Sequence, residues 1–177
     1  MAERINLKYT DEKDKLYGIS GMAITLVACN GEDLLSEVRV DTPAGSNMVM
    51  THDFAFNGNP RMSAKIVWAQ AMKDLRAMTS MTLGNIICRR RLLSGTPVEN
   101  ELIGGLRDLV RGECAEQCGL EADEADALFG ACHSYVERLF AHMAVCTMAE
   151  RLASRLAERR TLSGAEVVEY LDSLGLH

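Results

Sequence analysis

Two pairs of potential metal ligands are each spaced by about one helical turn. Cys114 and Cys118 form one pair, and His142 and Cys146 form the other. Because residues four apart lie on the same side of a helix, each pair could present two ligands to one ion. Three thiolates and an imidazole would suit a structural zinc ion. We favour packing as the alternative, since a free cysteine is commonly buried and these pairs lack the CxxC spacing of zinc knuckles.

Two further histidines lie next to acidic residues. His133 precedes Glu137 by four residues, a spacing that indicates an ordinary pair on the surface of a helix. His52 stands beside Asp53, after a possible strand. A catalytic base at either position would need partners that the sequence does not place. We therefore predict no catalytic residue and no cofactor from these histidines.

The bulk composition limits the classes of partner. The chain has 177 residues, of which 47% are hydrophobic, so it can form one domain with a substantial core. Its net charge of −6 argues against nucleic acid and against an anionic membrane surface. The longest apolar run, Met22 to Cys29, is too short to span a bilayer. Without an apolar leader near the start, we expect a cytoplasmic protein with reduced cysteines.

The sequence pattern predicts that these residues lie in an α+β fold that is mainly α. We expect one domain over residues 1–177, with a β-containing part at 1–60 and a helical part at 61–177. Residues 23–29 (AITLVAC) are rich in β-formers and precede Asn30-Gly31, a favoured hairpin turn. Residues 37–41 alternate in period two. Residues 48–56 add a third strand, with apolar Phe54 and Phe56 near its end.

Capping signals divide the helical part. Asn59 and Pro60 favour a helix start, and the helix continues to about residue 93. Residues 96–99 (TPVE) predict a capping box for a helix that ends at Gly119. Acidic residues at 121–124 favour the start of a long helix to about residue 160, and Ser163 with Glu166 predicts a final capped helix that ends near Gly175.

Several segments, taken in order, resemble the peptidase domain of FtsH-type AAA zinc proteases. That family has a helix with HEAGHA, a strand like KVTIIPRG, a helix with LGGRAAE, an Asn-Asp pair that opens a helix, and a final helix begun by ETLSGEE. The similar segments here are residues 18–23 (GISGMA), 37–45 (EVRVDTPAG), 81–88 (MTLGNIIC), 95–102 (GTPVENEL) with its helix to Gly119, and 160–167 (RTLSGAEV). The resemblance covers about residues 16 to 174, and it implies that residues 16–29 are a helix. Periodicity leaves helix and strand open there.

The chain departs from that family at the residues that do its chemistry. In the family, two histidines one turn apart bind zinc, and the glutamate between them activates water. The matching positions here are Gly18, Ile19 and Met22, which offer no suitable ligand or base. The family's third ligand, an aspartate, falls near Glu101. The resemblance therefore implies a peptidase-like helical bundle with a small N-terminal sheet and a lost active site.

Two functional hypotheses follow from the resemblance. The first is a non-catalytic protein that binds a protein partner or other copies of itself, since the family's peptidase domains form rings. The second is a divergent zinc hydrolase with relocated ligands drawn from His52, Glu101, His133, His142 or the cysteines. A structural zinc at Cys114, Cys118, His142 and Cys146 remains a separate possibility. We favour the first hypothesis.

Overall fold

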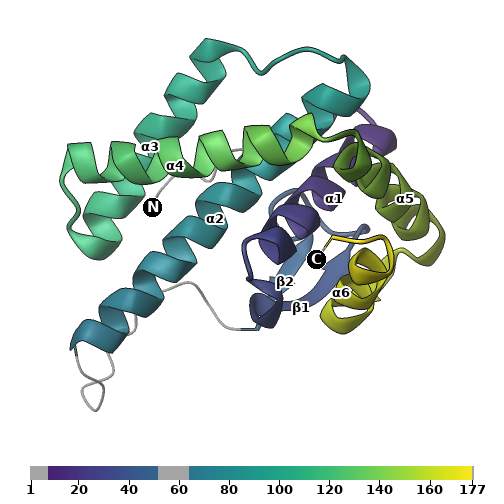
Figure 1. The fold of residues 1–177 in the computed structure, drawn as a ribbon, viewed down its shortest axis with the longest axis horizontal. Coiled ribbons are helices and arrows are strands. Elements are labelled where there is room, and N and C mark those ends of the chain that lie inside the picture. The colour runs from purple at the N-terminus through teal and green to yellow at the C-terminus, as the bar shows by residue number, and fades with distance from the viewer. Residues whose placement is uncertain (1–7, 52–63, 177) are drawn as a thin grey trace.

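A computed structural model describes residues 8–51 and 64–176 of the chain, and its elements confirm the α+β, mainly α class (Figure 1). In chain order the elements are α1 (Glu12–Ala28), η1 (Glu32–Leu34), β1 (Leu35–Arg39), β2 (Met48–Met50), α2 (Ala64–Leu93), α3 (Asn100–Cys118), α4 (Ala122–Ala141), α5 (Met143–Arg159), β3 (Thr161–Ser163) and α6 (Gly164–Ser173).

Helix α1 is the most deeply buried element. The Asp11 side chain caps it by accepting a hydrogen bond from the Asp14 backbone N–H at 2.8 Å. Every residue from Leu16 to Val27 is buried, so the segment lacks the polar face that marks an amphipathic helix. The strand predicted at residues 23–29 is therefore wrong, and the helix reading of residues 16–29 holds as far as Ala28.

The predicted hairpin turn instead closes this helix. Asn30 has a φ of 54°, in the left-handed region, and the Gly31 N–H donates to the Leu26 carbonyl oxygen at 2.9 Å. This hydrogen bond satisfies one of the carbonyls that a helix end leaves free. The same two residues suit a hairpin and a helix end because both need a residue with positive φ.

The sheet has the strand order β2-β1-β3 and is antiparallel throughout. Val38 of β1 pairs with Met48 of β2 on one side and with Leu162 of β3 on the other. The sequence pattern predicts β1 and the start of β2 but not β3. The third strand is therefore supplied by the C-terminal part of the chain. The predicted positions Phe54 and Phe56 lie outside the described residues.

Two predicted helix boundaries are wrong. Helix α3 begins at Asn100, so the capping box predicted at residues 96–99 does not form. The Thr96 hydroxyl instead bonds the Ser94 hydroxyl at 2.7 Å, and the Glu99 carboxylate accepts from Arg90. The long helix predicted to about residue 160 is broken at His142, whose ψ of 123° is extended and separates α4 from α5.

Other boundaries agree with the sequence. Gly119 ends α3 with a φ of 63°. Glu121 and Glu124 form a capping box on α4, in the acidic segment predicted to open that helix, and Ser163 and Glu166 form one on α6. The predicted start of α2 at Asn59 and Pro60 lies outside the described residues.

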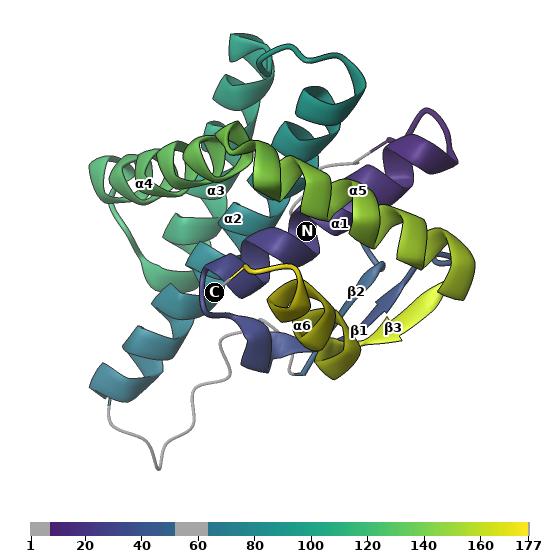
Figure 2. The same ribbon diagram turned by 45° about the vertical axis from the view of Figure 1, so that its right-hand side comes forward.

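The helices surround α1 unevenly (Figures 1 and 2). Helix α1 packs along α2 and also contacts α5, α6 and the sheet. Helices α3 and α4 pack on each other and on α2, at the other end of the molecule. None of the helices within residues 8–51 and 64–176 has the length and apolar content that crossing a membrane requires.

Candidate functional site

The positions that match the family's zinc motif lie inside the α1–α2 interface. Gly18, Ile19 and Met22 are all buried. A methyl group placed on Gly18 would come within 2.7 Å of Asn85 Nδ2, 2.8 Å of the Tyr9 ring and 3.0 Å of Arg89 Cδ. These distances are shorter than van der Waals contact. The space beside Gly18 is therefore already filled by three side chains.

Those three side chains belong to one hydrogen-bonded network. Asn85 Nδ2 donates to the Tyr9 hydroxyl at 2.9 Å, and the Arg89 guanidinium lies over the Tyr9 ring, 4.8 Å from its centroid. Arg89 also donates to both carboxylate oxygens of Asp14, with Nη2 at 2.6 Å from Oδ2, and to the Lys8 carbonyl at 2.9 Å. The network ties residues 8–14 to the last third of α2.

The charges in this network stabilise each other. Burial raises the pKa of Asp14, but hydrogen bonds from Arg89 and Thr10 and the charge of Arg89 outweigh it, and the pKa is lowered. Burial raises the pKa of Tyr9, against the hydrogen bond from Asn85. Asp14 and Arg89 thus form a bidentate ion pair. The Tyr9 ring lies against the Arg89 guanidinium, and burial favours its neutral phenol.

The chain is also closely packed one turn further along the same interface. A methyl group on Gly21 would overlap the Gly84 carbonyl oxygen, and one on Gly84 would overlap the Thr25 hydroxyl. The two glycines thus let α1 and α2 approach backbone to backbone. This contact fixes the position of Gly18 against Asn85 and Arg89.

The remaining predicted ligand, Glu101, is separate from these positions. It is exposed in the first turn of α3, and α3 packs on α4 and α2. The groups nearest to Gly18 come from residue 9 and from α2. The structure therefore does not bring Glu101 together with Gly18, Ile19 and Met22.

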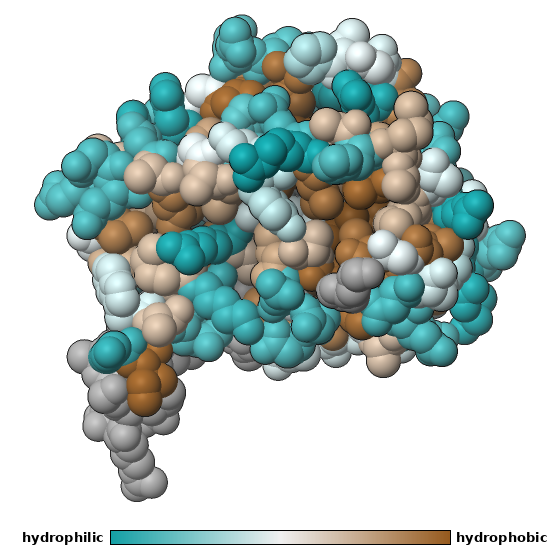
Figure 3. Space-filling view, in the orientation of Figure 1, coloured by the Kyte–Doolittle hydropathy of each residue, from teal (hydrophilic) through white to brown (hydrophobic). Residues whose placement is uncertain are grey.

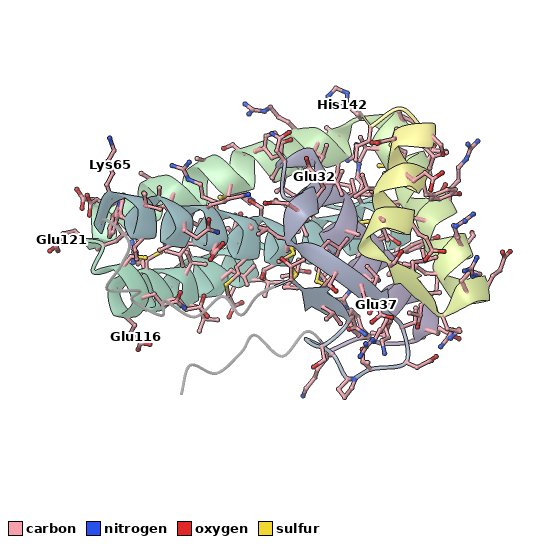
Figure 4. All side chains as sticks on the ribbon, turned by 90° about the horizontal axis from the view of Figure 1, so that it is seen from below. Glu32, Glu37, Lys65, Glu116, Glu121 and His142 are labelled. Carbon is pink, nitrogen blue, oxygen red and sulfur yellow. The ribbon has the colours of Figure 1, made fainter. Side chains whose placement is uncertain are left out.

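The four candidate zinc ligands are divided between the two ends of α4. Cys118 lies before this 20-residue helix and His142 follows it, which places them about 30 Å apart along the axis. Figure 4 shows His142 pointing outward at one end and Glu116, which lies between the two cysteines of α3, at the other. Cys146 donates a hydrogen bond to the Phe140 carbonyl at 3.3 Å. Across residues 8–51 and 64–176, no three His, Cys, Asp or Glu side chains form a group that could hold a metal.

The cysteines lie in surroundings that oppose thiolate formation. Burial raises the pKa of Cys114 to about 11, with smaller contributions from Cys118, Glu113 and Cys132. Burial also raises the pKa values of Cys88, Cys118 and Cys146. A thiol must lose its proton to bind metal or attack a disulfide, so these cysteines favour the packing interpretation. His52 lies outside the described residues.

A pocket that the sequence does not predict lies between α3 and α4. It has a volume of about 390 Å³ and includes His133, one of the candidate ligands. Its lining residues are Asn100, Ile103, Gly104, Arg107, Asp126, Phe129, Gly130 and His133. The signal that could have located it is the pair of glycines in helical segments, Gly104 and Gly130, which leave open space where a side chain would stand.

The chain matches no family model, and no curated protein matches its sequence.

Proposed function

We propose that the chain is a non-catalytic protein with an FtsH-type zinc-peptidase-like fold, and that it acts in the cytoplasm by binding protein, including other copies of itself. The observation that carries the proposal is the filled space beside Gly18. The segments that resemble the family's zinc helix and glycine-rich helix pack against each other through Gly21 and Gly84. Tyr9, Asn85 and Arg89 occupy the place where ligands and water would be needed.

The network around Gly18 would obstruct a metal as well as a substrate. A divalent cation there would lie beside the Arg89 guanidinium, and the nearest carboxylate, Asp14, is already bonded to that guanidinium. Like-charge repulsion and the loss of a buried ion pair would both oppose binding. A zinc hydrolase that uses these positions is therefore disfavoured on electrostatic grounds.

Apolar side chains at the surface support a binding role. Leu102 and Leu109, seven residues apart on α3, are exposed, and Met143 at the start of α5 is 80% exposed. In Figure 3 apolar residues also gather between α5 and α6. A contiguous exposed apolar patch is typical of a protein contact. The two leucines share one side of α3, since a seven-residue separation is close to two helical turns.

The proposal is tested by combining metal analysis with a measurement of mass in solution. Protein purified without added zinc is expected to contain far less than one equivalent, to leave casein intact, and to show a mass above that of one chain in light scattering at high concentration. Replacement of both exposed leucines, Leu102→Ser with Leu109→Ser, is expected to shift the mass toward the monomer.

Two results would overturn parts of this proposal. One equivalent of zinc together with chelator-sensitive casein cleavage would establish the hydrolase hypothesis instead. A chain that stays monomeric at all concentrations would remove self-association as its mode of action. A structural zinc would make the fold depend on the metal, so EDTA would then lower the melting temperature. We expect no change in excess EDTA, whether the chain binds a partner protein or other copies of itself.

A further inference from the structure

The pocket between α3 and α4 contains polar groups that make no hydrogen bond within the described residues. Within the described part of the chain, Arg107 makes no hydrogen bond or ion pair, although its charge helps to lower the pKa of Asp126. His133 Nε2 is buried without a hydrogen bond, and its closest carboxylate oxygen, on Glu137, is 3.6 Å away. That distance is too long for a hydrogen bond. The pocket is thus lined by an exposed arginine without a hydrogen bond in the described residues and by a histidine whose ion pair with Glu137 is long.

The acidic residue of the pocket is already neutralised. Asp126 accepts two hydrogen bonds from Arg111, from Nε at 2.6 Å and from Nη2 at 2.5 Å. The hydrogen bonds and charge of Arg111 lower the pKa of Asp126. This pair joins α3 to α4 and uses both Asp126 oxygens, so Arg107 interacts with Asp126 through its charge without a hydrogen bond.

The rest of the pocket is suited to a flat apolar group. The rings of Phe129 and His133 stack with centroids 6.0 Å apart and an interplanar angle of 10°, and Ile103 adds an aliphatic surface. A methyl group on Gly104 or Gly130 would meet nothing within 4 Å, so neither glycine is required for helix packing. Their missing side chains keep the volume of about 390 Å³ open, which is in the size range of small-molecule sites.

We infer that this pocket binds a small organic anion, a carboxylate attached to a planar apolar body, with the carboxylate on Arg107 and the planar body against Phe129, His133 and Ile103. A guanidinium presents two parallel N–H donors that match the two oxygens of a carboxylate. Asn100, at the first turn of α3, adds a further amide donor to the pocket lining. This binding site does not depend on the oligomeric state of the chain.

The test is a titration of the isotope-labelled full chain with benzoate, followed by two-dimensional amide NMR. Benzoate is expected to shift the resonances of residues around positions 100–107 and 126–133 in a saturable manner. Benzamide, which has the same shape without the charge, is expected to bind at least about tenfold more weakly, because a charge-assisted hydrogen bond is lost.

Three variants make the result specific. Arg107→Gln is expected to weaken benzoate binding about tenfold or more, since it removes the carboxylate partner. Arg151→Gln, at an exposed arginine on α5, serves as the matched control and should leave binding unchanged. Gly130→Leu should block the pocket while the chain stays folded, because the site of the new side chain is open.

The inference is overturned if benzoate causes no saturable shifts at these positions. It is also overturned if benzamide binds as tightly as benzoate, or if Arg107→Gln and Arg151→Gln have equal effects. The amide spectrum of each variant reports directly whether the fold is retained, so a loss of binding is not confused with unfolding.

Discussion

The α1–α2 interface and the α3–α4 pocket both contain glycines within helices, but their glycines have opposite surroundings. At Gly21 and Gly84 an added methyl group would overlap backbone or side-chain oxygen atoms of the neighbouring helix. At Gly104 and Gly130 it would meet nothing within 4 Å. A glycine in a helix costs about 1 kcal/mol relative to alanine. The first pair offsets this cost by close packing, and the second pair leaves open space beside its helices.

The charged groups of the two regions differ in the same way. Beside Gly18, Asp14 and Arg89 bond to each other and to Lys8 and Thr10, so both charged side chains there have partners. In the pocket, Arg111 and Asp126 are paired while Arg107 and His133 Nε2 have no hydrogen-bond partner in the described residues. The two regions therefore differ in whether a charged side chain is left without a hydrogen-bond partner from the described residues.

The largest effect is expected from Arg89→Met, which removes the partner of a buried carboxylate. The side chain of Asp14 is only 4% exposed, so the uncompensated charge should cost about 3 kcal/mol in the free energy of unfolding. The control is the adjacent Arg90→Met, whose partner Glu99 is exposed; that loss should be below about 1 kcal/mol. Urea unfolding of both variants measures the difference. Equal losses would mean that the interface is not held by this pair.

The next largest effect separates the two kinds of glycine. Gly84→Ala should destabilise the chain by about 2 kcal/mol, because overpacking against Thr25 and Gly21 exceeds the gain in helix propensity. Gly105→Ala, at an exposed position of α3, should stabilise it by up to about 1 kcal/mol, since only the propensity changes. The sign of the change in unfolding free energy is the measurement. A stabilising Gly84→Ala would show that α1 and α2 are not in close contact.

The elements that could be predicted from the sequence are those determined by neighbouring residues. The capping box of Ser163 and Glu166 and the left-handed glycine stop at Gly119 depend on contacts within a few positions, and both predictions are confirmed. The strand predicted at residues 37–41 from its alternation overlaps β1, which runs from Leu35 to Arg39. Helix α1 is buried on all sides, so its apolar run carries no helical period. The sequence pattern alone therefore does not distinguish helix from strand there.

The parts that could not be predicted depend on residues far apart in the chain. The β3 strand is three residues long and pairs with β1. The paired residues of the two strands are more than 120 positions apart in the sequence. The hydrogen bond that fills the space beside Gly18 joins Tyr9 to Asn85, 76 positions apart. Sequence patterns also identify glycines without showing whether they face a neighbour or open space. The pocket therefore emerges only from the packing of α3 on α4.

A smaller effect is expected from pH. The pKa of Asp14 is lowered in the folded chain, so the ionised carboxylate contributes stability that is present above its unfolded value and is lost as pH falls through the folded value. The Asp14→Asn variant lacks this contribution at every pH. The stability gap between the two proteins should therefore be largest near pH 6 and should narrow toward pH 3. A gap that is constant over this range would show that Asp14 is not held as a stabilised anion.

The smallest effect is expected from Tyr9→Phe. This variant tests whether the ring or the hydroxyl of Tyr9 contributes more to the packing over Gly18. The variant loses the 2.9 Å hydrogen bond from Asn85 Nδ2 but keeps the ring under the Arg89 guanidinium. One lost hydrogen bond should cost about 1 kcal/mol in unfolding free energy. Tyr9→Ala, which also removes the ring, should cost more, because Gly18 and Arg89 would then face a cavity. If both variants match the wild type in urea unfolding, residue 9 does not close the interface, and the space beside Gly18 is accessible after all.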